Sequence, residues 1–175
     1  EAELREILEK ESQKVGYNLL EACFPINPLI DIKRESDTVS DEEIKLLKRW
    51  SEVSYSVWNS VGASVWDSVW DSVGDSVRVS VWDSVWDSVG NSVWNSVRAS
   101  VRDSVRAYIS SLFPNIKKWK YVDHPEGENP FQSGVDLWRR GLVPSFNGKT
   151  WRLHAGKDAK VVYKWTPEKS YGDIV

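Results

Sequence analysis

The stretch "SVWDSVWDSVGDSVRVSVWDSVWDSVG", residues 64–90, belongs to an array of thirteen Ser-Val pairs that recur every four residues, from Ser56-Val57 to Ser104-Val105. The residue after each Val is Trp, Gly or Arg, and the next is Asp, Asn or Ala except at Val79. Positions that accept such different side chains are expected to face solvent, whereas the invariant positions are expected to pack. The candidate packing row consists of Val57, Val61, Val65, Val69, Val73, Val77, Val81, Val85, Val89, Val93, Val97, Val101 and Val105.

Two architectures can bury a row with a period of four. In an α-helix the row drifts by about 40° per repeat and suits crossing helices. In a β-solenoid with four-residue sides, Asp, Asn and Gly mark the corners, and the β-branched Val residues favour strands. The flanks favour the helix, because Val105, Ile109 and Phe113 keep the spacing of four up to Pro114. We predict a long helix or helical hairpin over residues 41–113, with the solenoid as the alternative.

The segments before the repeat also show helix signals. Residues 1–23 have helical apolar spacing with a break at Gly16, and a Pro-containing connection follows them. Ser40 and Glu43 have the spacing of a capping box, in which each side chain binds the backbone N–H of the other residue. A new helix is therefore expected from residue 41.

The segment after Pro114 reads as a small α+β module. "IKKWKYV", residues 116–122, alternates like a strand, and "NPFQSGVDLWRRG", residues 129–141, reads as a short helix. A β-meander follows, with a hairpin turn at Asn147-Gly148 because both residues tolerate positive φ. The expected core of this module is Trp138, Phe146, Trp151, Leu153, Val161 and Tyr163.

These expectations give an α+β protein with four parts. They are the N-terminal helices and linker (1–40), the tetrapeptide-repeat region (41–113), the small α+β module (114–165) and a tail (166–175). The chain contains eleven Trp, seven of them in or beside the repeat. No apolar run approaches the roughly 20 residues that cross a bilayer. The single Cys23 excludes an intramolecular disulfide framework. We therefore expect a soluble, cytoplasmic protein with no membrane partner.

The net charge of −3 hides an uneven distribution. Residues 1–97 hold 9 Lys and Arg against 18 Asp and Glu, whereas residues 98–165 hold 13 against 6. A basic segment with interleaved aromatic residues can bind phosphates and stack on bases. Alternatively, the acidic and basic segments bind each other. The candidate polyanion-binding residues are Arg98, Arg102, Arg106, Lys117, Lys118, Trp119, Lys120, Arg139, Arg140 and Arg152.

Candidates for catalysis and metal binding are few. His124 lies among Asp123, Glu126 and Glu128, and His154 lies on an expected strand, but no HxxxH or HExxH spacing occurs. Cys23 follows "LLEA" and is expected to fill a small core position. We predict no catalytic residue, no metal site and no cofactor.

The Ser-Val-[Trp/Arg/Gly]-[Asp/Asn/Ala] array, followed by "AYISSLF" and "DLWRRGLVPSFNGKTWRLHAG", resembles uncharacterised microbial tetrapeptide-repeat proteins that share this layout. The resemblance covers residues 56–165 and implies no activity and no site residue. From the residues we predict a non-enzymatic structural or assembly protein whose repeat mediates packing or self-association with a second copy or another protein. The alternative is a nucleic-acid-binding protein that uses the basic, aromatic C-terminal half.

Overall fold

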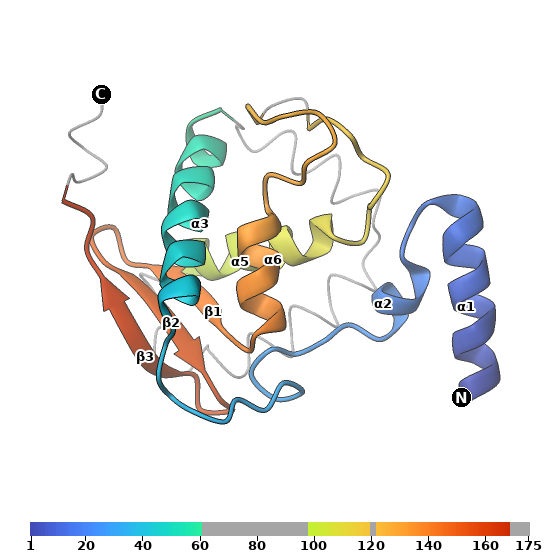
Figure 1. Ribbon diagram of the computed structural model, residues 1–175, viewed down its shortest axis with the longest axis horizontal. Helices are drawn as coiled ribbons and strands as arrows, with labels where there is room; N and C mark the ends of the chain where they lie inside the picture. The colour runs from blue at the N-terminus through green and yellow to red at the C-terminus, as the bar shows by residue number, and fades with distance from the viewer. Residues whose placement is uncertain (61–97, 120–121, 169–175) are drawn as a thin grey trace.

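The computed structural model describes residues 1–60, 98–119 and 122–168, apart from the side chains at 55–60, 98–102 and 106. This part of the chain forms helices and one three-stranded antiparallel sheet, which confirms the predicted α+β class (Figure 1). In chain order the elements are α1 (Ala2–Val15), α2 (Leu19–Cys23), α3 (Asp41–Ser60), α5 (Arg98–Ser110), α6 (Gln132–Arg139), β1 (Val143–Phe146), β2 (Trp151–Ala155) and β3 (Lys160–Trp165).

Both flanks of the repeat are helical. α3 contains the first Ser-Val pair and ends at Ser60, and α5 contains the last two pairs. Val105 in α5 is buried, as its place in the packing row predicts. Residues 61–97, with the packing row from Val61 to Val97 and the choice between helix and solenoid there, lie outside the described residues.

Local signals place the N-terminal helices. α1 ends at Gly16, whose φ of 66° is left-handed and therefore suits glycine. The Ser40 Oγ accepts a hydrogen bond from the Glu43 N–H at 3.3 Å, and the Glu43 Oε2 accepts one from the Ser40 N–H at 2.9 Å. The predicted break at Gly16 and the predicted capping box are both confirmed.

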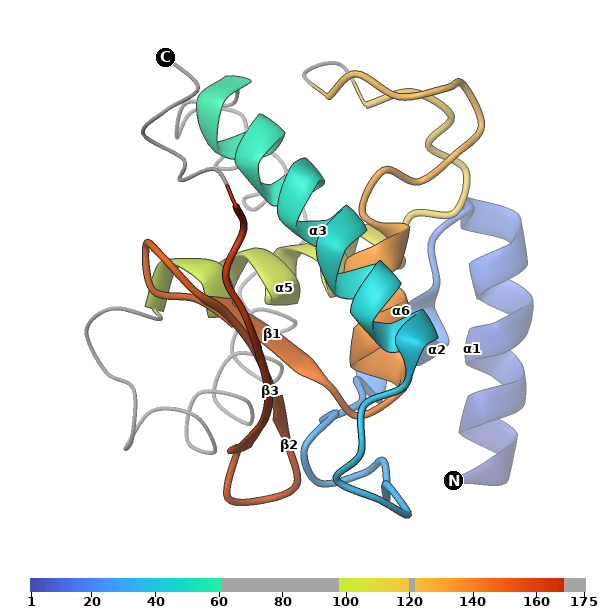
Figure 2. The same ribbon diagram turned by 60° about the vertical axis from the view of Figure 1, so that its left-hand side comes forward.

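The sheet has the order β1-β2-β3, and α3 and α5 both pack against α6 beside it (Figures 1 and 2). Phe146 pairs with Trp151 across the predicted hairpin, in which the Asn147 Oδ1 accepts hydrogen bonds from the N–H groups of Lys149 and Thr150. A register shift follows Leu153 in the pairing of β2 with β3.

Two apolar clusters form the core, and each draws residues from both sides of the repeat. The first contains Ala22, Leu29, Val105, Tyr108, Ile109, Leu112, Trp138, Val143 and Ala159. The second contains Leu46, Leu47, Trp50, Ala107, Val122, Phe131, Val135, Leu137, Leu142, Trp151, Leu153 and Ala155. Trp138, Trp151 and Leu153 are buried as predicted, and Phe146 and Tyr163 pack partly buried against the second cluster. The division at residues 40, 113 and 165 stays a prediction, and both clusters cross it.

The strand predicted over residues 116–122 is wrong where the structure describes it. Residues 116–119 form no strand, because their polar groups bind the following loop instead of a neighbouring strand. The Trp119 N–H donates to the His124 Nε2 at 2.8 Å, and the Lys118 Nζ donates to the His124 carbonyl. Within the described ranges, no helix is both long enough and apolar enough to cross a bilayer.

Candidate functional site

The predicted polyanion-binding residues whose side chains the structure describes do not gather into one site. Lys117, Lys118 and Trp119 precede the loop that leads to the start of α6, whereas Arg139 and Arg140 lie at its end (Figure 1). Eight helical residues span about 12 Å, so the two groups lie at opposite ends of that helix. Arg152 lies on β2. Arg98, Arg102 and Arg106 belong to α5, but their side chains, like all of Lys120, lie outside the description.

The two arginines at the end of α6 bind carboxylates from the acidic half of the chain. Arg140 binds Glu42 through two hydrogen bonds of 2.9 and 3.1 Å, and Arg139 lies 3.3 Å from Glu21. The hydrogen bond from Arg140 lowers the pKa of Glu42, and the same bond raises the pKa of Arg140. Both guanidinium groups are therefore already paired with a carboxylate of the protein.

A second set of ion pairs joins the linker to the rest of the molecule. The Arg34 Nη1 donates to the Glu43 Oε1 at 2.7 Å and to the Arg140 carbonyl at 2.9 Å. Burial alone would raise the pKa of Glu43, but hydrogen bonds from Arg34 and Ser40 outweigh it and hold that pKa below its ordinary value. Lys160 binds Asp37.

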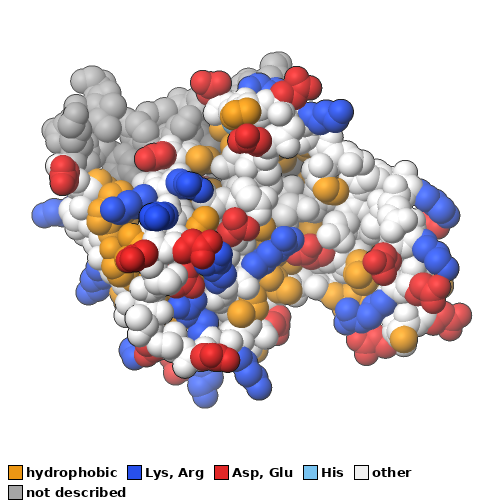
Figure 3. Space-filling view, viewed as in Figure 1, with side chains coloured by type: hydrophobic (Ala, Val, Ile, Leu, Met, Phe, Trp, Pro, Cys, Tyr) orange, Lys and Arg blue, Asp and Glu red, His pale blue; other side chains and the backbone are white. Residues whose placement is uncertain are grey.

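On the surface drawn in Figure 3, Lys and Arg side chains alternate with Asp and Glu side chains. Together with three ion pairs that join described residues on the two sides of the repeat, this mixing matches the alternative in which the acidic and basic segments bind each other. Trp119 is also engaged, because its partly buried ring meets Phe131 edge-on with the centroids 5.2 Å apart. The predicted stacking ring thus packs against the protein's own core.

A buried hydroxyl–imidazole pair lies on the sheet. The His154 Nε2 lies 2.7 Å from the Ser145 Oγ, and its Nδ1 lies 2.9 Å from the Ala159 carbonyl. Since a carbonyl only accepts, Nδ1 carries the proton and Nε2 accepts from Ser145. Burial lowers the pKa of His154 and so favours this neutral form. The pair has the geometry of a base beside a nucleophile, but both residues are 0% exposed and a substrate cannot reach them.

We interpret Ser145, His154 and Ala159 as a structural connection between β1, β2 and the turn before β3. The sequence analysis missed this connection, although the hairpin whose turn includes Asn147-Gly148 contained the signal. Its register places Val143 opposite His154, and alternation then puts Ser145 on the same face as His154.

The acidic residues around His124 do not converge on the imidazole. Asp123, Glu126 and Glu128 are exposed, whereas His124 is buried. Across residues 1–60, 98–119 and 122–168, no three His, Cys, Asp or Glu side chains lie close enough together to hold a metal ion. Cys23, expected in a small core position, is exposed instead, because α2 turns only Ala22 into the core.

α1 presents a different kind of surface. No residue of α1 is buried, and Leu4, Ile7 and Val15 are 50%, 52% and 61% exposed. Ion pairs along the helix, Glu1–Arg5 at 3.0 Å and Glu6–Lys10 at 2.7 Å, stabilise it by itself. α1 lies at the end of the molecule away from the sheet (Figure 1).

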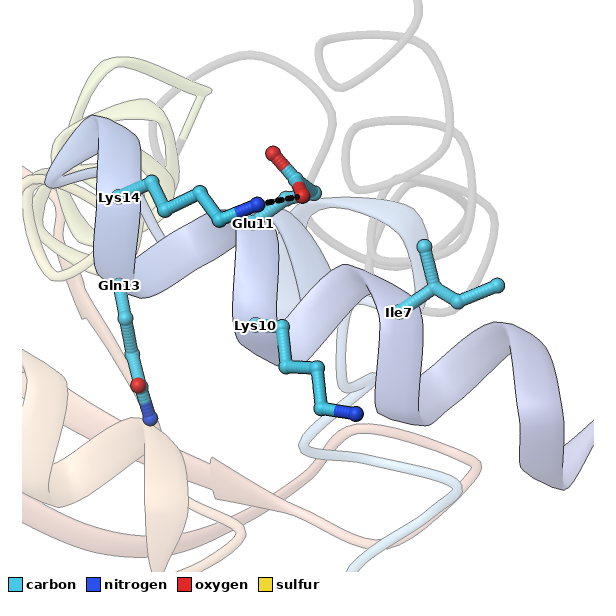
Figure 4. A pocket seen from close by; sticks show the side chains of 5 residues that line it. All are labelled: Ile7, Lys10, Glu11, Gln13 and Lys14. Carbon is cyan, nitrogen blue, oxygen red and sulfur yellow. Dashed lines mark hydrogen bonds and ion pairs between the residues drawn. The ribbon is translucent and has the colours of Figure 1, made fainter.

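A shallow hollow of about 380 Å³ runs along this helix. The residues that line it are Ile7, Lys10, Glu11, Gln13 and Lys14. Figure 4 shows Lys14 reaching Glu11, while Lys10 and Gln13 extend on the other side of the helix. One apolar side chain, Ile7, thus lies beside charged side chains of both signs in this hollow. Comparison of the chain with protein-family models, curated proteins and solved structures finds no match in any of the three.

Proposed function

We propose that this protein is a non-enzymatic assembly protein that binds a second copy of itself. The observation that carries this proposal is α1, a 14-residue helix with no buried residue and three apolar side chains at least half exposed. Exposed apolar residues that recur along one helix are expected to be covered by a partner. A second molecule of the same chain is the commonest partner in soluble assemblies.

The order of charges along α1 supports a second copy of the same helix. Residues 1–9 carry four Glu and one Arg, whereas the second half carries Lys10 and Lys14 with one acid, Glu11. Two such helices packed antiparallel would place the acidic half of one beside the lysines of the other, around Leu4 and Ile7. The excess of Glu on this helix disfavours the surface of an anionic membrane, which attracts basic helices.

The Ser-Val repeat is proposed to contribute to the same assembly. Its invariant Val row and variable outer positions support this role, and its two helical flanks are both fixed on the core. We propose that the assembly works in the cytoplasm, in keeping with a chain that holds a single cysteine.

Sedimentation equilibrium over a hundredfold range of protein concentration tests the proposal. We expect reversible dimers, and we expect the double variant Leu4→Glu/Ile7→Glu to dissociate at higher concentration than the parent. Ile30→Glu is the matched control, because Ile30 is 56% exposed but lies outside α1. A parent chain that stays monomeric throughout would refute self-association. Dimers that persist in the α1 variant would refute the helix as the interface and leave the repeat as the contact.

Nucleic-acid binding is the less supported alternative. Arg139 and Arg140 contact Glu21 and Glu42, so binding a phosphate there would first break protein ion pairs. Anisotropy of labelled single- and double-stranded oligonucleotides at several salt concentrations separates the two functions. Affinity that falls steeply with salt would indicate phosphate contacts and support the alternative.

A further inference from the structure

β3 is an edge strand of the sheet. The order β1-β2-β3 gives it a single neighbouring strand, and among the described elements only β2 packs extensively against it. Figure 1 shows β3 at the outer side of the sheet, at the opposite end of the molecule from α1. An edge strand presents backbone N–H and C=O groups that can pair with another extended chain.

Two cations lie side by side on one face of this edge. Trp151 and Leu153 of β2 are buried in the second apolar cluster, so Arg152 between them lies on the other face of the sheet. The pairing of β2 with β3 places Lys164 directly opposite Arg152. Like charges that lie directly opposite each other destabilise a sheet. This arrangement therefore favours an anionic group that binds both side chains.

Neither of these cations has an ion-pair partner in the described part of the chain. Arg139, Arg140 and Lys160 each bind a carboxylate. No such pair of Arg152 or Lys164 occurs among the described residues. The Arg152 Nε is also buried, and no described group accepts a hydrogen bond from it. A buried donor without an acceptor costs free energy, which an incoming carboxylate would recover.

The other face of the β3 edge is aromatic. Tyr163 and Trp165 pair with Leu153 and Trp151, and both pack partly buried against the second cluster. The Lys48 Nζ lies 5.5 Å from the centre of the Trp165 ring. Side chains of a strand alternate between the two faces of a sheet. A strand added to β3 would therefore place every second side chain beside the two cations and the others beside these rings.

We propose that the edge of β3 binds an extended acidic peptide of a partner protein, with an acid at every second position and apolar residues between. The peptide backbone pairs with β3, and its carboxylates bind Arg152 and Lys164. Its apolar side chains lie against Tyr163 and Trp165. This mode of binding, the addition of a strand to a sheet edge, takes its affinity from main-chain hydrogen bonds and its specificity from alternate side chains.

The charges also decide between this partner and two others. A second copy of β3 would bring Lys160 and Lys164 to an edge that is already basic, so charge disfavours it. A nucleic acid has the required charge but lacks the peptide groups that pair with a strand edge. The site does not depend on the proposed self-association, because α1 lies at the other end of the molecule (Figure 1).

Fluorescence anisotropy of the full chain with a labelled peptide of three Glu-Val repeats tests the site. We expect saturable binding that weakens as salt rises, and about tenfold weaker binding of the matched Gln-Val peptide. Lys164→Glu should weaken binding of the Glu-Val peptide about tenfold, because a repulsion replaces an attraction. Lys157→Glu is the matched control, because Lys157 is exposed in the turn before β3, and it should change the affinity less than about twofold.

Methylation of the peptide backbone distinguishes strand pairing from a general attraction between charges. Only alternate residues of a strand direct their N–H groups towards a given neighbouring strand. One Glu-Val peptide N-methylated at its Glu residues and one N-methylated at its Val residues should therefore differ about tenfold in affinity, because only one of them keeps the N–H groups that face β3.

Four results would overturn the proposal. The first two are no binding of the Glu-Val peptide at low salt and equal binding of the two N-methylated peptides. The third is an equal effect of Lys164→Glu and Lys157→Glu. The fourth is full competition by single-stranded oligothymidylate at the same concentration of charge, which would indicate a general polyanion site. Binding that persists in Leu4→Glu/Ile7→Glu would support the site on β3, whereas binding lost in that variant would assign the peptide to α1 instead.

Discussion

Gly134 in α6 lies where the two helices that flank the repeat meet the rest of the core. A Cβ atom at this position would lie 2.8 Å from the Trp50 Cε3, 3.0 Å from the Trp50 Cζ3 and 3.0 Å from the Ala107 Cβ. Trp50 belongs to α3 and Ala107 to α5, so one methyl group at Gly134 tests both contacts. The perturbation is Gly134→Ala.

Two opposing effects determine the result. In a helix interior, replacing Gly by Ala ordinarily stabilises by about 1 kcal/mol. Against this, an extra methyl group in a closely packed core costs about 1–3 kcal/mol. The cost should lie in the upper part of that range, because Trp50 is 2% exposed and Ala107 is 0% exposed, so neither can move into solvent. We therefore expect Gly134→Ala to lower the free energy of unfolding by about 1–2 kcal/mol.

Urea unfolding followed by circular dichroism measures this change, and a double-mutant cycle with Trp50→Leu assigns its cause. Trp50→Leu alone should destabilise strongly, because it leaves a cavity. In the Trp50→Leu variant, Gly134→Ala should lower the free energy of unfolding by less than in the parent, or should raise it. The coupling between the two positions should be about 1 kcal/mol. If Gly134→Ala stabilises the parent by the full helix-propensity gain, the close packing of α3 and α5 on α6 is not as described.

Three further predictions follow from single contacts. Tyr108→Phe removes the hydroxyl that accepts the Ile26 N–H at 3.1 Å, and urea unfolding should show a loss of about 1–2 kcal/mol. Burial lowers the pKa of His154 below 6.5, so its contribution to stability is complete above pH 6.5 and is lost as the pH falls through the folded-state pKa. Between pH 6.5 and 5 the parent should therefore lose stability more steeply than His154→Gln. Arg140→Ala should return the pKa of Glu42 towards 4.5, as read from its carboxyl ¹³C shift; an unchanged pKa would exclude the ion pair in solution.

The sequence predicted the elements that depend on neighbouring residues. The end of α1 at Gly16 requires only a residue that tolerates positive φ, and the start of α3 requires only Ser40 and Glu43 three positions apart. The hairpin at Asn147-Gly148 is equally local, because the Asn147 side chain binds N–H groups two and three residues ahead. Such signals act within one turn of chain, so they do not depend on the rest of the fold.

Local sequence patterns did not show how the structure uses several of the candidate residues, because residues distant in the sequence decide it. Arg139 binds Glu21 across 118 positions and Arg140 binds Glu42 across 98, so no local pattern shows that these cations are occupied. The alternation in residues 116–119 resembles a strand, but His124 takes the Trp119 N–H that a ladder would need. In both cases a tertiary partner competes for a group whose sequence context suggested another use.

The division of charge along the chain has a structural consequence. Glu21, Asp37 and Glu42 precede the repeat, and each binds a basic residue that follows it: Arg139, Lys160 and Arg140. Each pair is at least partly exposed, so each alone contributes little to stability. In all three pairs the acid comes from the segment before the repeat and the base from the segment after it. This arrangement favours one way of packing the two segments together, because a shift between them would separate the opposite charges. Both apolar clusters also contain residues from before and after residues 61–97, and α3 and α5, which hold the first and the last two Ser-Val pairs, pack on the same core through Trp50 and Ala107.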